Sequence, residues 1–442
     1  MVNDRVHPSP DPAGASRREA LRRAAVLGGG LAAACGPGPG GGPAAPSTRP
    51  ATVGIRTFTG QAVVDVMEKT VLPGYRQKAP RHTVQWEQQT TGSGAQMIEA
   101  VTAASAAGTP PDVFYIGSDW IAQLARGRLI KDLSALVKAW GQDKEYYPNT
   151  VEALWGRRWF LPQIASCDLY LYRLDWFREA NLPVEPARFP VAWEAFAEAA
   201  AALTRRQGEE VTRAGFYTTG EVREWRQLLW QASGEEWNAD HSRATYNSPA
   251  GVEALTYLRD LLVRYRVAPA AGFPIPTGNN ALAAGLAAIL RNTPGGANTV
   301  LTRAPDVFAQ TGFGPPHRRA RQVNQVDVDG WAMTAGAREP EAGFALLAHI
   351  EEPANLLAWN EATGLIPPRK ALATSAHVQQ PFIKAFQAAL EQHGRGYHQY
   401  QTAILNTAAA DAVQGRKTPQ QALDDAAREN DAFLAQLQPV PR

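Results

Sequence analysis

The sequence predicts an α/β protein with a doubly wound sheet and more than one domain. Its 442 residues exceed the length at which one hydrophobic core usually stops growing, so two domains are expected. Between residues 51 and 134, short apolar runs alternate with helical patterns, as they do in a largely parallel sheet. A hydrophobic content of 45% with 19% charged residues is that of a globular chain that can bury a core.

The first part of the chain consists of three strand–helix units, of which the third is the clearest. Pro110 and Pro111 exclude helix, and the apolar run 112–116 after them suits a strand buried on both faces. Ser118 or Asp119 can then cap a helix that starts near Trp120. Strands are expected at 51–58, 83–89 and 112–116, and helices at 61–78, 95–107 and 120–127.

The rest of the chain contains apolar runs separated by amphipathic helices, with no internal repeat. Strands are expected at 158–164, 168–172, 216–219, 287–290, 325–329 and 331–334, and helices at 175–182, 193–206 and 252–264.

Residues 1–34 are expected to form an export signal. The stretch 16–22 resembles the twin-arginine motif, with Ala20 where Phe is commoner. Residues 24–34 follow as an uncharged run of small and apolar side chains, too short to span a bilayer. The sequence therefore predicts a protein exported through the cytoplasmic membrane.

The segment that follows predicts a lipid anchor. Residues 31–35 resemble a bacterial lipobox, although Leu31 lies one place further from Cys35 than is usual. The run 36–43 contains only Gly and Pro, which is typical of a tether without regular structure. We expect cleavage before Cys35, acylation of Cys35 and a linker over 35–50, which would hold the protein at the outer face of the membrane. A flexible terminus with an incidental Cys is the other interpretation.

Charge and cysteine content narrow the function classes. The formal net charge is +2, and the charged residues of the leader account for it, so nothing favours a nucleic-acid partner. If Cys35 carries lipid, only Cys167 remains and no intramolecular disulfide is possible. Cys167 is expected to be a small, semi-buried residue.

The order and spacing of several segments resemble the bacterial extracellular solute-binding proteins that include the maltose-binding protein. The resemblance covers residues 51–442, and each piece alone is weak. In the piece at 282–289, Leu282 and Ile289 replace the Phe and Met that are usual in the family. The pieces are 108–113, 129–133, 170–180, 282–289, 331–334, 339–342 and 359–370.

This resemblance implies a type II periplasmic-binding-protein-like fold, in which two lobes, each a mixed sheet flanked by helices, close on a ligand about a hinge. The chain is expected to cross between lobes near 165–168, 303–306 and 350–353. The N-terminal lobe would then comprise 51–165 plus 306–350, and the C-terminal lobe 166–305 plus 351–442. The implied partners are a carbohydrate or similar small polar ligand and the permease subunits of an ABC importer, and we expect a monomer.

The loops that follow the predicted strands supply the candidate ligand contacts, since ligands of open α/β sheets bind beyond the carboxyl ends of the strands. Sugars need flat aromatic faces together with hydrogen-bonding groups. For Trp120, Trp225 and Trp331, core packing is the alternative, and for Asp119 it is helix capping. Trp140, Trp176 and Trp193 are expected in cores. The predicted ligand-binding residues are Thr91, Asp119, Trp120, Trp225, Arg291, Asn292, Gly330, Trp331, Glu361 and Arg369.

Two other functions remain open from the sequence. No nucleophile elbow, HExxH motif or metal-ligand spacing appears, so we expect neither catalysis nor a cofactor or metal, although a secreted carbohydrate-active enzyme is the rival class. The same fold could bind a glycerol phosphate ester through Arg291 and Arg369, or another small polar solute. The supply of aromatic residues and the resemblance favour a carbohydrate.

Overall fold

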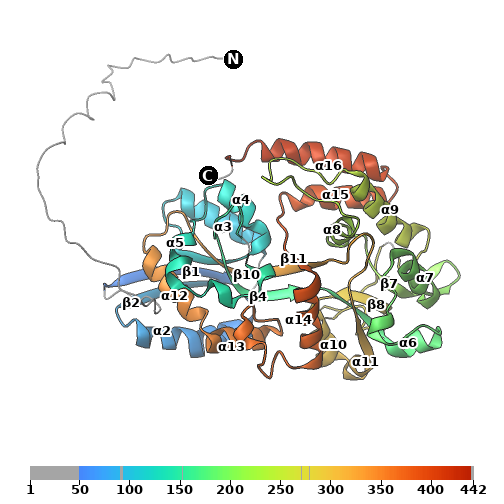
Figure 1. The fold of residues 1–442 in the computed structure, drawn as a ribbon, viewed down its shortest axis with the longest axis horizontal. Coiled ribbons are helices and arrows are strands. Elements are labelled where there is room, and N and C mark those ends of the chain that lie inside the picture. The colour runs from blue at the N-terminus through green and yellow to red at the C-terminus, as the bar shows by residue number, and fades with distance from the viewer. Residues whose placement is uncertain (1–48, 90–92, 152, 270, 278, 440–442) are drawn as a thin grey trace, which may run out of the picture. The chain divides into compact units, whose positions relative to one another are not determined.

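The computed structural model describes residues 49–89, 93–151, 153–269, 271–277 and 279–439. Within them the chain forms two mixed β-sheets flanked by helices (Figure 1), which confirms the predicted fold class. The export signal, Cys35, most of the linker and Thr91 lie outside the described residues. None of the described helices is both long enough and apolar enough to cross a membrane.

The first sheet has the strand order β11-β10-β3-β1-β2, and β4 also pairs with β10, over residues 326–331. Strands β1, β2 and β3 are parallel, whereas β10 runs antiparallel to β3 and β4. All five residues of β3 are buried, as expected for the apolar run after the two prolines. The strands are β1 (Ala51–Phe58), β2 (His82–Gln89), β3 (Val113–Gly117), β4 (Leu161–Cys167), β10 (Asn324–Met333) and β11 (Gly394–Arg395).

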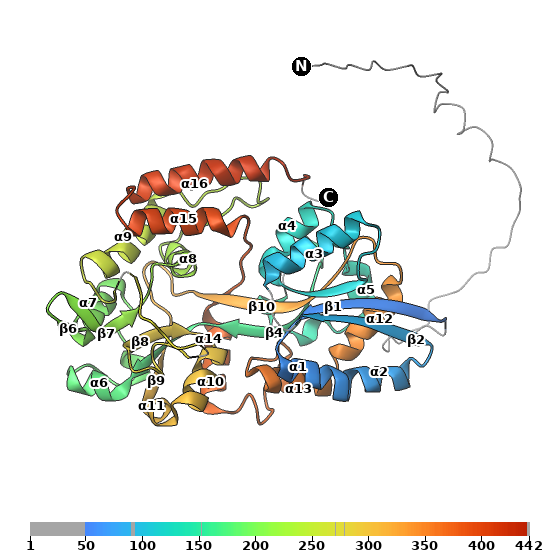
Figure 2. The same cartoon turned by 180° about the vertical axis from the view of Figure 1, so that it is seen from behind.

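Helices cover both faces of this sheet. Figures 1 and 2 show α1, α2 and α13 on one face and α3 and α4 on the other. We call this sheet with its helices the first lobe. Its helices are α1 (Gln61–Val66), α2 (Leu72–Lys78), α3 (Gly94–Ala106), α4 (Ile121–Arg126), α5 (Ser134–Trp140), α12 (Pro340–Ile350) and α13 (Pro353–Thr363), with a π-helical turn (Met67–Val71) between α1 and α2.

The second sheet has the order β6-β7-β8-β5-β9, in which only β7 and β8 are parallel. We call it, with its helices, the second lobe. Helices α15 and α16 lie side by side next to α9 (Figures 1 and 2). The strands are β5 (Leu169–Arg173), β6 (Arg205–Gln207), β7 (Glu210–Tyr217), β8 (Ala287–Asn292) and β9 (Thr311–Gly314). The helices are α6 (Leu174–Glu179), α7 (Trp193–Leu203), α8 (Val222–Gln231), α9 (Pro249–Val263), α10 (Pro294–Arg303), α11 (Pro305–Ala309), α15 (Thr402–Val413) and α16 (Pro419–Leu434). Helix α14 (Pro381–His393) contacts α10 of this lobe and also β4 and β10.

The chain passes from the first sheet to the second at Asp168, the single residue between β4 and β5, within the range expected from the sequence. It returns between Gly314 and Asn324, later than the expected range 303–306, because β9 pairs with β5. The third passage follows α13 rather than residues 350–353. Trp359 of α13 packs 5.5 Å from Tyr115 of β3, which keeps this helix in the first lobe.

Candidate ligand-binding site

A cavity of about 760 Å³ lies at the start of α8. The loop after β7 forms one wall, since Gly220, with φ +78°, turns the chain into the helix. The side chain of Thr218 accepts from the N–H of Gly220 at 3.0 Å and bonds to Glu224 in the first turn. We call this space the α8 cavity; it is lined by Thr219, Gly220, Glu221, Val222, Arg223, Arg226, Ala271, Gln325, Tyr397, Gln399, Thr402, Asn406, Ala410, Val413 and Gln414.

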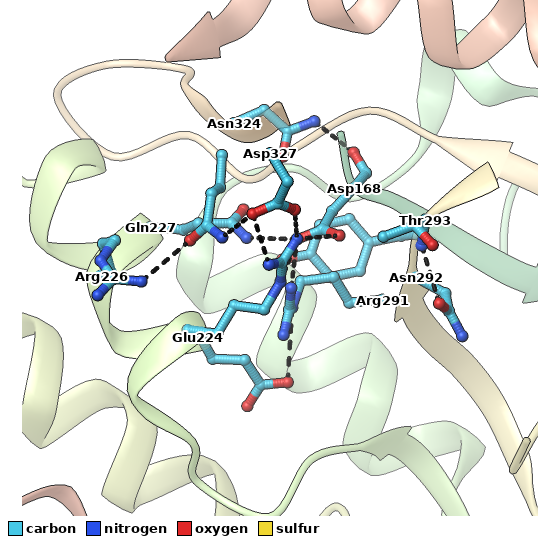
Figure 3. Close-up of polar contacts among 12 residues, drawn as sticks. Asp168, Glu224, Arg226, Gln227, Arg291, Asn292, Thr293, Asn324 and Asp327 are labelled. Carbon is cyan, nitrogen blue, oxygen red and sulfur yellow. Dashed lines mark hydrogen bonds and ion pairs between the residues drawn. The ribbon is translucent and has the colours of Figure 1, made fainter. Parts of the chain in front are cut away.

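Asp168, at the passage between the sheets, is the centre of a buried polar network (Figure 3). Its carboxylate accepts from Arg223 Nε at 3.2 Å and Nη2 at 3.0 Å, and from Gln227 Nε2 at 2.7 Å. Arg291 of β8 bonds to the same carboxylate. Burial alone would raise the pKa of Asp168, but the charges of Arg223 and Arg291 outweigh it and lower the pKa to about 2. Asp168 is therefore ionised at neutral pH.

A second carboxylate shares Arg223. Asp327 of β10 accepts from Arg223 Nη1 at 3.0 Å and also bonds to Nη2. Gln325 Nε2 at 2.8 Å and the Tyr397 hydroxyl at 3.2 Å donate to the same oxygen of Asp327. The Tyr397 ring also lies 4.3 Å below the guanidinium of Arg226. One side of the α8 cavity is thus a continuous set of charged and hydrogen-bonding groups.

Asp119 lies beyond the carboxyl end of β3, where the sequence places it, in a 3-10 turn (Ser118–Trp120) that precedes α4. It is partly buried and hydrogen-bonds to Gln399 through both its carboxylate and its backbone oxygen, the latter at 2.8 Å. Burial, followed by repulsion from Asp329 and Asp327, raises the pKa of Asp119 to about 7. Since Gln399 also lines the α8 cavity, Asp119 is connected to it.

The other predicted contacts near β3 and β8 lie at the ends of the expected strands. Trp120 is partly buried, with its indole against the start of α3: a Cβ at Gly94 would lie 2.6 Å from Trp120 Nε1. Arg291 has only 8% of its side chain exposed and is bound by Asp168, with Glu224 at 3.6 Å. Asn292 accepts from the N–H of Thr293 at 2.8 Å, at the start of α10 (Figure 3).

Of the three tryptophans predicted as ligand contacts, Trp225 and Trp331 lie in cores instead, which corrects that expectation. Trp225 is 1% exposed, and its Nε1 donates to Gly251 O at 3.1 Å. Trp331 is fully buried, with its Nε1 donating to Gln163 Oε1 at 2.7 Å. Each ring therefore has its polar atom satisfied by the protein and no face open to a ligand. Of the three tryptophans expected in cores, Trp140 and Trp193 are buried and Trp176 is partly buried.

Four predicted contacts remain, and the three of them that the structure describes do not line the α8 cavity. Gly330 is required by strand packing, because a Cβ there would lie 2.0 Å from the Leu161 carbonyl oxygen of β4. Arg369 is 5% exposed and donates to Glu351 O at 2.8 Å and to Gln142 Oε1 at 2.7 Å within the first lobe. Glu361 is exposed near the end of α13. Thr91 lies outside the described residues.

Five residues at or near this site were not predicted from the sequence: Arg223, Asp327, Asp329, Tyr397 and Gln399. Asp327 and Asp329 could have been predicted to lie together, because residues two apart on a strand point to the same face of the sheet. Arg223 could not be predicted, since helical periodicity indicates which face of α8 is buried but not which residues of other elements lie against it. Tyr397 and Gln399 lie between β11 and α15 with no distinguishing pattern around them.

The arrangement supports reversible binding of a polar molecule. Carboxylates and amides offer paired acceptors and donors to hydroxyl groups, and Tyr397 adds an aromatic face. Within the described residues no group of three or more His, Cys, Asp and Glu side chains could hold a metal ion. Cys167 is buried, and burial raises the pKa of its thiol well above the usual range, which disfavours the reactive thiolate.

The sequence and the fold of this chain are similar to those of known proteins. The sequence profile of the bacterial extracellular solute-binding proteins matches residues 60–356. Solved structures with the same fold include a solute-binding protein of an ABC transporter from Thermotoga lettingae bound to α-D-tagatose, with 20% identity, a TM-score of 0.70 and coverage of 87% of this chain and 99% of that one. A maltose-bound protein of T. maritima has 20% identity and a TM-score of 0.67, covering 87% and 100% of the two chains.

A third similar structure is the sugar-binding protein MalE of Xanthomonas citri, at 16% identity and a TM-score of 0.73, covering 87% of this chain and 97% of that one. These likenesses agree with the two-lobed fold, and the profile match extends over well more than half of the sequence. The resemblance noted from the sequence is thereby confirmed: the chain belongs to the bacterial extracellular solute-binding protein family.

Proposed function

We propose that this protein captures a carbohydrate between its two lobes and delivers it to an ABC importer. The observation that carries the proposal is the α8 cavity, whose wall combines Arg223, Gln325, Tyr397 and Gln399, with Asp119 bound to Gln399. Such a mixture of planar polar groups and an aromatic ring suits the hydroxyl rim and C–H face of a sugar. The similar proteins described with tagatose and maltose support the same class of ligand.

A phosphate ester is less well matched. Arg291 and Arg369, the two arginines that favoured it, are largely buried and already bound by protein acceptors. Arg223 and Arg226, which line the α8 cavity, are paired with Asp168 and Asp327 and with Glu236. A dianion would therefore have to displace carboxylates, whereas a hydroxyl group only adds a hydrogen bond.

A thermal-shift screen over a library of sugars, polyols and glycerol phosphate tests the ligand class. A ligand that binds only the folded protein raises the melting temperature. The stabilisation grows with the logarithm of the ligand concentration once that concentration exceeds Kd. We expect a shift with at least one sugar and none with glycerol phosphate; the reverse pattern would reject the carbohydrate. Analysis of the sugar after incubation then separates binding from catalysis, since we expect unchanged sugar, and new reducing ends would indicate an enzyme.

We also propose that the mature protein is a monomer anchored at the outer face of the cytoplasmic membrane through lipid on Cys35. The sequence pattern around Cys35 and the Gly/Pro tether support the lipid anchor. Cells grown with labelled fatty acid should incorporate label into the wild-type protein and not into Cys35→Ala. Cys167→Ala is the matched control and should keep the label; label retained in Cys35→Ala would reject the anchor.

A further inference from the structure

Arg223 lies where the α8 cavity meets the strands that join the lobes. It belongs to the first turn of α8 and lines the cavity. Its side chain is 27% exposed, compared with 8% for Arg291, the other arginine on Asp168. Of these two arginines, Arg223 is the more accessible to a bound molecule.

The guanidinium of Arg223 makes two forked contacts at once. Nε and Nη2 hold Asp168 at 3.2 and 3.0 Å, while Nη1, at 3.0 Å, and Nη2 hold Asp327. A guanidinium carries five N–H donors, and among the described residues these bonds use four of them. One N–H of Nη1 therefore remains for a ligand oxygen in the cavity.

The two carboxylates belong to different parts of the molecule. Asp327 lies on β10 of the first sheet, whereas Asp168 is the residue at which the chain passes to the second sheet. Gln227, one turn further along α8, also donates to Asp168, and Arg226 Nη1 donates to Gln325 of β10 at 3.4 Å. Helix α8 of the second lobe is thus attached to β10 of the first lobe by a row of polar contacts, and Arg223, Arg226 and Gln325 of this row line the cavity.

We propose that Arg223 binds the ligand directly and couples occupancy of the α8 cavity to the angle between the lobes, an inference that rests on the proposed function. A ligand oxygen that accepts the remaining N–H is bound best in the lobe arrangement in which both forks hold the guanidinium in place. The ligand then favours that arrangement by the difference between its affinities for the two states. Arg223 is in this sense a specificity residue for the ligand and a positioning residue for the lobes.

Spin-label distances in the purified full chain test the coupling without any ligand. Labels at Lys138→Cys on α5 and Glu198→Cys on α7, both exposed positions, report the separation of the lobes. The background carries Cys35→Ala, and Cys167 is buried. Arg223→Lys keeps the charge but cannot form two forks, and Asp327→Asn weakens the first-lobe end of the bridge. Arg213→Lys is the control, because Arg213 pairs with Glu179 at 3.8 Å inside the second lobe.

We expect the distance distribution to broaden or shift in Arg223→Lys and in Asp327→Asn and to stay unchanged in Arg213→Lys. The double variant should add nothing to the larger single effect, because both changes break one bridge. Unchanged distributions in both single variants would overturn the coupling.

Titration with maltose tests the direct contact. Arg223→Lys should weaken maltose binding at least tenfold with the control unaffected, and equal affinity in Arg223→Lys and wild type would overturn the contact. A wild-type protein that binds no sugar would reject the proposed function instead, and the ligand-free distances would still decide whether Arg223 links the lobes.

Discussion

Asp119 and Asp329 occupy the same small space at the edge of the first sheet. Asp329 on β10 pairs with Gly117 of β3, and a Cβ at Gly117 would lie 2.2 Å from Asp119 Oδ1 and 3.2 Å from Asp329 Oδ1. Burial, followed by repulsion from other carboxylates, raises the pKa of each to about 7. The site therefore holds two carboxyl groups that change charge near neutral pH.

Protein stability should fall as the pH rises through neutrality. An unfolded Asp titrates at the ordinary value of 3.8, so above that pH the folded protein holds protons that the unfolded chain has lost. The stabilising contribution is complete below pH 3.8 and disappears as the pH rises through about 7. We expect the free energy of unfolding in urea to decrease between about pH 4 and pH 7 and to level off above about pH 8, and Asp119→Asn to make this decrease smaller.

Glu361→Gln is the control for that measurement, because Glu361 is exposed and lies outside the pair. Its pH profile should follow the wild type. If Asp119→Asn and Asp329→Asn both leave the slope unchanged, the two carboxyl groups do not titrate in the way their burial indicates.

Replacement of Trp225 or Trp331 by Ala should act on stability. Both rings are buried and hydrogen-bonded to the protein, so truncation leaves a cavity and an unpaired acceptor, at a cost of about 3–5 kcal/mol in the free energy of unfolding. Trp176→Ala, at a partly buried position beneath Arg173 and Arg213, should cost less. Urea unfolding measures the free energy of unfolding of all three variants. A Trp225→Ala protein that is stable but has lost sugar affinity would contradict the core position of this ring and indicate that it contacts the sugar.

Arg291→Met should destabilise the second lobe strongly. It leaves Glu224 without its cation and removes one of the two arginines that hold Asp168, and loss of one partner of a buried ion pair costs about 3–5 kcal/mol. Arg205→Met breaks a more exposed pair with Glu179, which solvent screens, and should cost much less. Equal losses in the two variants, measured by urea unfolding, would contradict the structural role assigned to Arg291.

The strand–helix order could be predicted because it depends on local patterns, whereas the passage near 165–168 was implied by the family resemblance. Apolar runs bounded by Pro, Gly and Ser define β3, and β4 and β5 are two such runs separated by Asp168. The later boundaries could not be predicted in this way. Whether β9 pairs with β5, or α13 packs on the first lobe, depends on contacts between residues far apart in the chain.

The dependence on contacts between residues far apart in the chain also decided which site residues could be predicted. Asp119 follows a buried strand, and its position at the sheet edge follows from the topology of parallel strands. Trp225 was predicted as a ligand contact because its Glu-Trp-Arg stretch resembles that of the family, but its ring packs in the core. Arg223 could not be predicted as a site residue, because its contact with Asp327 depends on β10 lying beside α8.

Calorimetric titration of the purified protein with the sugar that gives the largest thermal shift tests the central claim most directly. We expect saturable binding of one sugar per chain with a negative heat-capacity change. We also expect at least tenfold weaker binding by Asp119→Asn, because we propose that Asp119, which is bound to the cavity residue Gln399, accepts from sugar hydroxyls. Binding heat that is absent for every sugar in the library, or equal affinity in Asp119→Asn and wild type, would contradict carbohydrate capture at this site.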